Sequence, residues 1–303
     1  MKKTFFAFSL IVALLLLGIV LHKTIDRTSG QLATHETGQY ERIVSLSPNI
    51  TETLFALGMG DKLVGVTRFC NYPPEAKSLP KVGGYLDLNY EAIIRLRPDL
   101  VLLTDDFQQS KVFFSQLGIK YISVNNKTVS DIRSSIAYLG KILGTNSRAE
   151  EILKEIDTKI STIQHRTEAL YRPNVMIVIE RTMGTGAIED VYIAGKNTFF
   201  DELIEMAGGK NAYQDGKITY PMVSAEGISH LNPAIIIDLI PQLKQTGLDS
   251  LKVVSDWSSL PDVEAVSKRQ IYIISDDYAV IPGPRFYLFL ELLARIIHPE
   301  IDW

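Results

Sequence analysis

Cysteine is almost absent from the 303-residue sequence, in which Cys70 is the only one. A single cysteine excludes an intramolecular disulfide and a Cys-x-x-Cys zinc or redox pair. It also leaves no cysteine near the N-terminus to carry a lipid. We therefore expect a fold that needs no covalent cross-link, even in an oxidising compartment.

Runs of one charge are also lacking. The chain has 31 Lys and Arg against 35 Asp and Glu, a formal net charge of −4 at pH 7. No stretch of Lys and Arg is dense enough to follow a row of phosphates. We expect no nucleic-acid partner.

Signatures of catalysis and metal binding are missing as well. Gly208-Gly209-Lys210 is followed by Asn211, so no phosphate-binding loop is present, and no Gly-x-Ser-x-Gly elbow occurs. The five histidines form no i, i+3 or i, i+4 pair that would indicate a metal site. We expect a protein that is not an enzyme and has no metal or cofactor of its own.

Long hydrophobic runs are limited to one, Thr4–Leu21, which follows Lys2 and Lys3. This run is longer than the core of a typical signal peptide and just reaches the length that crosses a membrane. No A-x-A cleavage site follows directly. We predict a signal anchor, or alternatively a cleaved signal peptide, over residues 1–30, and a polar tether over 31–40. Both alternatives export the rest of the chain.

Beyond the tether, short apolar runs alternate with segments of helical spacing, which is typical of an α/β fold with parallel strands. The strands are expected at 42–46, 62–66, 100–103 and 121–124 in a first lobe over residues 41–146. A second α/β lobe is expected over 173–303, with strands at 175–179, 235–240 and 270–274. Between the lobes, apolar residues at helical spacing predict one long helix over 147–172.

The two lobes share a sequence motif. Residues 91–98 read EAIIRLRP and precede an apolar strand, and residues 226–233 read EGISHLNP and do the same. Every matched position has the same offset along the chain, that from Glu91 to Glu226. We interpret this as a duplicated lobe, with a ligand-binding cleft between the two copies.

Several ordered blocks carry a resemblance to a known family. They are SLSPNITE (45–52), TRFCNYPPEA (67–76), KVGGYLDLN (81–89) and LRPDLV (96–101) in the first lobe, and VYIAGKNTFFDEL (191–203), MAGGKN (206–211) and VSAE (223–226) in the second. Together they resemble the periplasmic substrate-binding proteins of cobalamin and iron-siderophore ABC importers. The resemblance covers residues 40–298 and implies the fold of a class III periplasmic binding protein, two Rossmann-like lobes joined by a single long α-helix. In this chain the predicted N-terminal membrane segment precedes that fold.

The resemblance also implies functional residues. Glu91 and Glu226 match the glutamates that meet the two permease subunits in cobalamin-binding members. The aromatic residues that line the cleft in such members match Phe69, Tyr85 and Tyr220, and Asp276 matches an acidic contact. Tryptophan stands at some of these positions in that subgroup but not here. Arg68 and Arg181, on loops expected to face the cleft, suit a ligand that carries carboxylates or a catecholate iron chelate.

The expected function is capture of a metal chelate, a corrinoid such as cobalamin or a ferric siderophore, and its delivery to an ABC permease dimer with its ATPase. The protein is expected to be a monomer on the periplasmic side of the inner membrane. A membrane-anchored ligand sensor and an α/β enzyme that uses the same cleft are the alternatives.

Overall fold

Four parallel strands form the sheet of the N-terminal lobe, in the order β2-β1-β3-β4. They are β1 (Ile43–Ser45), β2 (Leu63–Val66), β3 (Leu100–Thr104) and β4 (Tyr121–Val124). The helices of this lobe are α2 (Pro48–Ala56), α3 (Tyr90–Arg95), α4 (Gln108–Gln116) and α5 (Val129–Ile142), with 3-10 turns at Gly60–Lys62 and Pro74–Ser78. The structure is a computed structural model and describes residues 39–303.

The C-terminal lobe has a mixed sheet in the order β10-β9-β5-β6-β8, with β7 beside β5. Its strands are β5 (Asn174–Arg181), β6 (Val191–Ile193), β7 (Lys210–Asn211), β8 (Met222–Val223), β9 (Ile235–Leu239) and β10 (Ile271–Ile274). Strands β5, β9 and β10 are parallel, whereas β6 pairs antiparallel with both β5 and β8. The helices are α7 (Phe199–Met206), α8 (Ala225–Leu231), α9 (Leu243–Thr246), α10 (Ser250–Ser255), α11 (Glu264–Ser267) and α12 (Phe286–Ile297), with 3-10 turns at Asp256–Ser259 and Asp277–Ala279.

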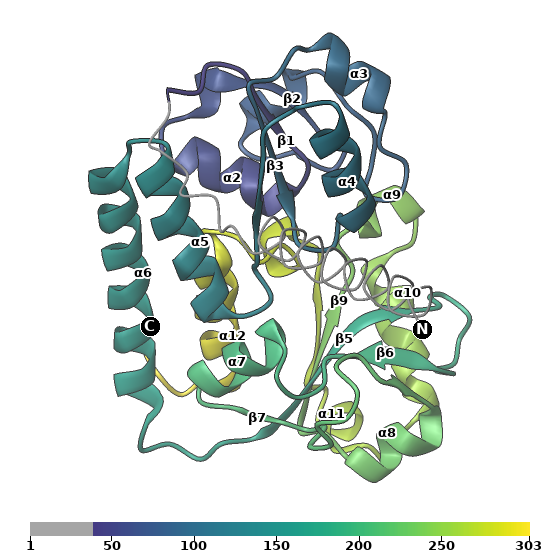
Figure 1. Cartoon of the computed structure of the whole chain (residues 1–303). Coiled ribbons are helices and arrows are strands. Elements are labelled where there is room, and N and C mark those ends of the chain that lie inside the picture. Colours follow the sequence, from purple (N-terminus) through teal and green to yellow (C-terminus); the bar gives the residue numbers. More distant parts are fainter. Residues whose placement is uncertain (1–38) are drawn as a thin grey trace, which may run out of the picture. The chain divides into compact units, whose positions relative to one another are not determined.

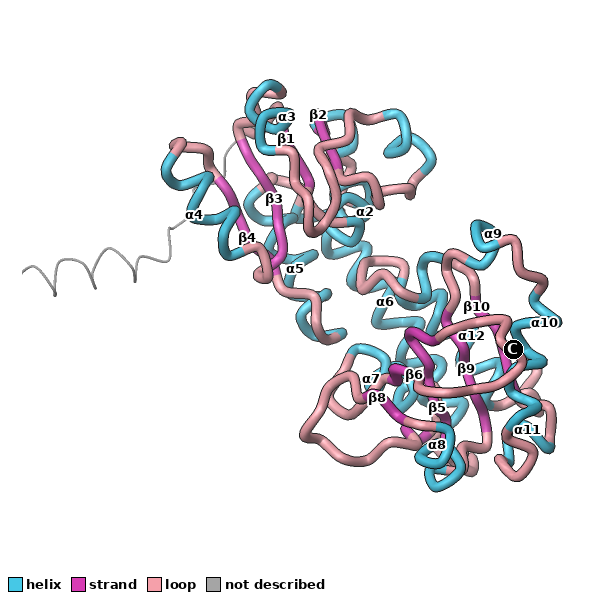
Figure 2. The backbone as a smooth tube through the Cα atoms, turned by 90° about the vertical axis from the view of Figure 1, so that its right-hand side faces the viewer, coloured by secondary structure: helices cyan, strands magenta, loops and turns pink. Residues whose placement is uncertain are grey.

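One long helix, α6 (Asn146–Thr167), runs between the lobes (Figures 1 and 2). It ends at Thr167, short of the predicted position 172. Its buried isoleucines are spaced by three or four residues, so they form a single apolar stripe. They are Ile152, Ile156, Ile160 and Ile163.

Strand residues alternate between two cores in each lobe, as the two-residue period of a strand requires. Leu100 and Leu102 of β3 pack toward α2, α5 and α6, whereas Val101 and Leu103 pack toward α3 and α4. In the C-terminal lobe the inner faces of β5 and β9 pack toward α7 and α12. The inner faces of both sheets belong to one continuous hydrophobic cluster that includes α6. Residues 39–303 accordingly form one compact unit.

Polar contacts also join the lobes. Arg285, just before α12, donates to the buried Glu52 of α2 through Nε (2.9 Å) and Nη2 (2.5 Å). The Val129 amide at the start of α5 donates to Oε2 of Glu202 in α7 (2.6 Å). Burial raises the pKa of Glu52 more than Arg285 lowers it. These contacts join α2 and α5 of the N-terminal lobe to the start of α12 and to α7 of the C-terminal lobe.

The motif repeat is visible in the backbone. Helices α3 and α8 begin at the offset that separates the two motif copies, and strands β3 and β9 begin and end at that same offset. The turns between them place Arg97 (φ 48°) and Asn232 (φ 42°), which are matched positions of the motif, in the left-handed region. Pairing registers agree too, because Val101 lies beside Tyr121 and Ile236 beside Ile271. The two lobes therefore repeat one helix-turn-strand unit in the same sheet position.

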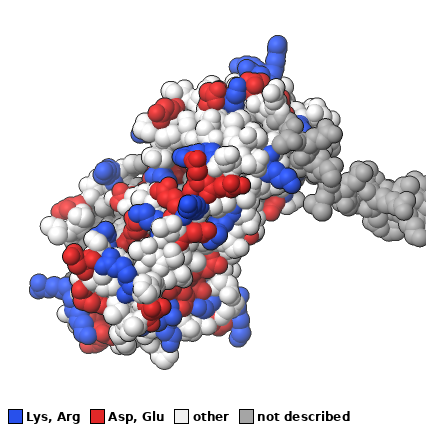
Figure 3. Space-filling model, turned by 90° about the vertical axis from the view of Figure 1, so that its left-hand side faces the viewer, with Lys and Arg blue, Asp and Glu red and all other residues white. Residues whose placement is uncertain are grey.

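The predicted membrane segment at residues 4–21 lies outside the described residues. Among residues 39–303, no helix is both long and apolar enough to cross a membrane. On the face shown in Figure 3, Lys and Arg are interspersed with Asp and Glu and form no continuous basic patch.

Candidate functional site

The candidate site is a cavity of about 640 Å³ between the two lobes. Apart from Tyr85, the residues that the N-terminal lobe contributes lie at or just after the carboxyl ends of β1, β3 and β4. Ligands of open α/β sheets bind at this edge, where the strand ends leave a crevice. The C-terminal lobe closes the cavity with three loops. The lining residues are 47–49, 85, 104–106 and 125–127 from the first lobe, and 197–200, 219–220 and 280–282 from the second.

Charged side chains are few in this lining and are paired. Asp105 lies 3.0 Å from Lys111 Nζ, and this hydrogen bond holds the pKa of Asp105 below its usual value. Asp106 lies 3.8 Å from Lys127 Nζ. Lys127 is the only Lys or Arg among the lining residues that the structure describes.

Two of the predicted aromatic residues, Tyr85 and Tyr220, line the cavity from opposite lobes. The ring of Tyr85 packs edge-to-face on Phe107 at a centroid distance of 5.0 Å. Burial raises the pKa of both phenols, and the nearby Asp106 charge raises that of Tyr85 further. Both rings therefore stay neutral and present apolar faces with a polar end, which suits a large planar ligand.

Phe69 and Arg68 follow the end of β2 and do not line this cavity. Phe69 is 48% exposed, and the centroid of its ring lies 5.8 Å from the Arg68 guanidinium carbon. Arg68 is also paired with Asp87 of the same loop region, and this ion pair lowers the pKa of Asp87. Arg68 thus interacts with residues of its own loop region and not with the cavity lining.

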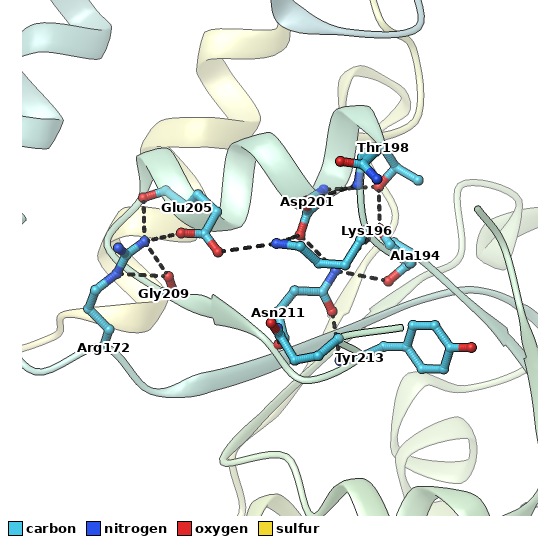
Figure 4. Close-up of polar contacts among 12 residues, drawn as sticks. Arg172, Ala194, Lys196, Thr198, Asp201, Glu205, Gly209, Asn211 and Tyr213 are labelled. Carbon is cyan, nitrogen blue, oxygen red and sulfur yellow. Dashed lines mark hydrogen bonds and ion pairs between the residues drawn. The ribbon is translucent and has the colours of Figure 1, made fainter. Parts of the chain in front are cut away.

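The C-terminal wall is held by a polar network (Figure 4). Asp201 of α7 accepts from the Asn197 amide (3.0 Å) and from Asn211 Nδ2 (3.1 Å), and pairs with Lys196 Nζ (3.0 Å). Thr198 Oγ1 accepts from the Asp201 amide and so caps α7. Asn197 is in the left-handed region (φ 62°), which asparagine tolerates better than most residues. The network therefore fixes the loop that presents Asn197 and Thr198 to the cavity.

Two lining residues have polar atoms without a hydrogen-bond partner among the described residues. These buried atoms are Thr104 Oγ1 at the end of β3 and Asn126 Oδ1 after β4. Asn126 as a whole is only 7% exposed. Unsatisfied buried polar groups are rare and costly in folded proteins, so both positions point to a missing partner.

Arg181 is not at the cavity, contrary to the sequence prediction. It is the last residue of β5, and its side chain is 2% exposed and contacts two aspartates. Its Nε donates to Asp238 (2.8 Å) and its Nη1 to Asp256 (2.9 Å). The role expected of Arg181 as a clamp for a charged ligand is therefore corrected. It is the counter-ion of a buried ionic cluster.

Asp276 is exposed and precedes the 3-10 turn at Asp277–Ala279. It does not line the cavity, although the segment 280–282 that follows this turn does. Among residues 39–303, no group of three or more His, Cys, Asp and Glu is placed to hold a metal ion.

Comparison with known proteins assigns the chain to a family. The model of a family described as periplasmic binding protein matches residues 43–278. The chain belongs to the periplasmic binding protein family. This confirms the resemblance that the sequence blocks carry, and the α/β architecture with parallel strands agrees with it.

Relatives of this periplasmic binding protein include both uncharacterised and named receptors. An uncharacterized ABC transporter substrate-binding lipoprotein of Bacillus subtilis, YvrC, is 31% identical over 91% of this chain and 86% of its own. The vitamin B12-binding protein of Pectobacterium carotovorum is 27% identical over 80% and 90%. The solved structure of the periplasmic heme-binding protein RhuT of Roseiflexus sp. RS-1 is 29% identical, with a TM-score of 0.73 over 86% of this chain and 99% of its own.

Glu91 and Glu226 occupy matching places in this periplasmic binding protein. Each is the second residue of its helix, α3 or α8, and each is exposed. Each helix has a side-chain cap, in which Asn89 accepts from the Ala92 amide and Ser224 from the Gly227 amide. Glu91 pairs with Arg95 at 2.7 Å. The two carboxylates thus lie on equivalent elements of the two lobes, outside the cavity.

Sequence reasoning missed most of the polar lining. Asp105-Asp106 and Asn125-Asn126 directly follow predicted parallel strands, and that position is the signal that places them at the cavity. Asn197 and Thr198 lie inside a block that the family resemblance singles out, yet the sequence alone predicts no role for them.

Proposed function

We propose that this protein is the substrate-binding component of an ABC importer and captures a metal chelate in the cavity between its lobes. The observation that carries the proposal is the cavity itself, which is about 640 Å³ in volume and lined from both lobes by strand-end loops and two tyrosines. This volume and lining are typical of a small-molecule site. Family membership and the relatives named for vitamin B12 and heme binding support the same role.

The proposed ligand contacts are a reduced version of the predicted set. Tyr85 and Tyr220 pack against the ligand from the two lobes. Phe69 and Arg68 extend the site beyond the cavity lining if the ligand is large, and Asp276 contacts it past the 280–282 segment. Arg181 is left out because both of its aspartate partners are internal.

The proposed delivery partner is a permease dimer with its ATPase. Glu91 and Glu226 would each meet one permease subunit, because two exposed carboxylates on repeated elements suit a partner with two-fold symmetry. Charge complementarity of this kind mainly sets orientation and the rate of association. The protein would work as a monomer on the periplasmic side of the inner membrane, with residues 4–21 as its predicted anchor or signal peptide.

Binding is tested by titrating the purified full chain with a panel of metal chelates and following Tyr and Trp fluorescence. One-to-one binding of one member is expected. The variants Tyr85→Ala and Tyr220→Ala should each lower the affinity about tenfold, because an aromatic contact contributes roughly 1 kcal/mol beyond its buried area. The exposed Tyr171, which is outside the lining, provides the control Tyr171→Ala. A folded protein that binds none of the panel contradicts the proposal.

Docking is tested separately with the double variant Glu91→Lys/Glu226→Lys. Uptake of the bound chelate by cells should fall at least tenfold while the affinity of the purified variant stays within twofold of the parent. The matched control is Glu150→Lys/Glu168→Lys, which reverses two exposed carboxylates at the start and at the end of α6. Equal loss of uptake in both double variants would contradict the docking role of Glu91 and Glu226.

A further inference from the structure

We infer that the cavity selects a metal chelate that is uncharged or cationic and carries N–H or O–H donors on its periphery. This inference rests on the proposed function and narrows its ligand. Three independent features of the lining support it: the balance of charge, the state of the helix N-termini, and the unpartnered polar atoms.

The charge of the lining disfavours an anion. Asp105 and Asp106 are balanced by the ammonium groups of Lys111 (3.0 Å) and Lys127 (3.8 Å), so the lining carries no net positive charge. Neither of the two arginines expected to receive a negative ligand lines the cavity, since Arg68 lies outside the lining and pairs with Asp87, and Arg181 is buried against two aspartates. An anionic ligand would therefore meet neither a net positive charge nor a guanidinium in the lining.

Helix N-termini also attract anions, and four helices, α2, α4, α5 and α7, begin within two residues of the lining. Helix α4 has no side-chain cap, but the carboxylates of Asp105 and Asp106 lie just before its start. In the other three helices the chain supplies its own acceptor. Asn49 Oδ1 accepts from the Ile50 amide in α2, Glu202 Oε2 from the Val129 amide in α5, and Thr198 Oγ1 from the Asp201 amide in α7. The first turn of α7 also carries two carboxylates, Asp201 and Glu202. These helix starts are thus compensated before any ligand binds.

The unpartnered atoms indicate what the ligand provides. Asn126 Oδ1 can only accept a hydrogen bond, and Thr104 Oγ1 can accept or donate. Both residues line the cavity next to the two aspartates. Donors on the ligand would satisfy these atoms after a small side-chain rotation, whereas carboxylate or phenolate oxygens would leave Asn126 Oδ1 without a partner.

A corrinoid with amide side chains fits these requirements, as does a neutral or cationic ferric hydroxamate with amide N–H groups. Haem, whose propionates are ionised, and a trianionic ferric catecholate do not. The cavity would thus distinguish between chelates that the family resemblance leaves open.

The test is competitive titration of the full chain with four probes: dicyanocobinamide, a ferric trihydroxamate, haem and a ferric tricatecholate. We expect one of the first two to bind at least 100-fold more tightly than either anionic probe. Asp106→Asn should reduce that ratio about fivefold to tenfold, because it removes a negative charge and frees Lys127. The control Asp262→Asn removes an exposed carboxylate outside the lining and should leave the ratio unchanged.

Asn126→Ala tests the acceptor. It should weaken the preferred chelate about fivefold to tenfold, the effect of one hydrogen bond in a buried site. Asn146→Ala, at the exposed start of α6, is the matched control and should have no effect. Thermal melting of each variant checks that the fold is retained.

The outcomes separate this inference from the proposed function. Tighter binding of haem or of the catecholate overturns the inference and leaves the capture of a chelate standing. Unchanged affinity in a folded Asn126→Ala variant also overturns the proposed donor contact. Failure of all four probes to bind overturns the proposed function and the inference together.

Discussion

The cores of the two lobes differ in chemistry at one matched position. Leu103 of β3 and Asp238 of β9 are equivalent positions of the repeated unit, occupy the same register and are both buried. Leu103 packs among apolar residues, whereas Asp238 accepts from Arg181 and from Trp257 Nε1 (3.2 Å). Burial nevertheless raises the pKa of Asp238. A repeated backbone thus accepts either an apolar or an ionic core, provided that every buried charge has partners.

Substitution in the ionic core should cause the largest loss of stability in this comparison. Arg181→Met leaves Asp238 and Asp256 buried without their shared counter-ion, and breaking a buried pair in this way costs about 3 to 5 kcal/mol of unfolding free energy. Urea denaturation measures the loss. A cost below about 1 kcal/mol would contradict the view that Arg181 holds the cluster together.

A double variant sharpens this result by making the C-terminal lobe resemble the N-terminal one. Arg181→Met/Asp238→Leu replaces the pair by apolar side chains, and such replacements are often close to neutral. Asp256 keeps its hydrogen bonds from the Gly184 and Gly186 amides (2.7 and 2.8 Å). We expect the double variant to be more stable than the single variant Arg181→Met. The reverse order would show that the lobe requires the charges.

The same cluster predicts a pH dependence that the apolar core of the other lobe lacks. Burial alone would raise the pKa of Asp256, but hydrogen bonds from Arg181 and the two glycine amides outweigh it and hold the pKa below its usual value. A carboxyl with a lowered folded pKa stabilises the fold above its unfolded pKa, and this contribution is lost as the pH falls through the folded pKa.

The variant Asp256→Asn isolates this effect. It should cost about 2 kcal/mol at pH 7, the contribution of hydrogen bonds to a charged group, and progressively less below about pH 4. Denaturation of parent and variant at several pH values measures the difference, with Asp262→Asn as the control. A difference that grows toward acid pH would reverse the sign that we derive.

Helix caps should have equal effects in the two lobes. Asn89→Ala and Ser224→Ala each remove a side-chain acceptor at the start of the repeated helix, and each should cost about 1 kcal/mol. The measurement is again the free energy of unfolding. Unequal losses would show that the matching turns are supported differently by their surroundings.

The smallest expected effect is a gain in stability. Arg97 has a positive φ where the other lobe has Asn232, and asparagine tolerates the left-handed region better. Arg97→Asn should therefore raise the stability by about 0.5 kcal/mol, and Arg97→Gly by a similar amount. A destabilised Arg97→Asn variant would mean that the arginine side chain supports the turn by contacts beyond its backbone.

Periodicity predicts the elements that carry strong apolar patterns and misses the weak ones. The runs at 100–103 and 235–240 are buried on both faces, and the structure confirms them as strands β3 and β9. Strands β7 and β8 have two residues each, too few for any period. The start of the long helix is one residue earlier than predicted, at Asn146.

The site is less predictable than the fold, because exposure cannot be read from residue type. Tyr85 and Tyr220 line the cavity as expected, but Arg181 ends a strand in much the same way as Arg68 follows one and is nevertheless buried. Its partners, Asp238 and Asp256, come from elements 57 and 75 residues away along the chain. Only the folded arrangement reveals that these charges compensate one another.

The continuous core through α6 has a consequence for how such a protein can change in evolution. Residues of both sheets, of α6 and of α12 belong to one cluster, so cutting the chain between the lobes would expose the interior of each. A lobe of this protein therefore cannot be exchanged by itself for a lobe of another protein. Recombination with a relative should yield a foldable chimera only when the crossover leaves each sheet together with the isoleucine stripe that it packs against.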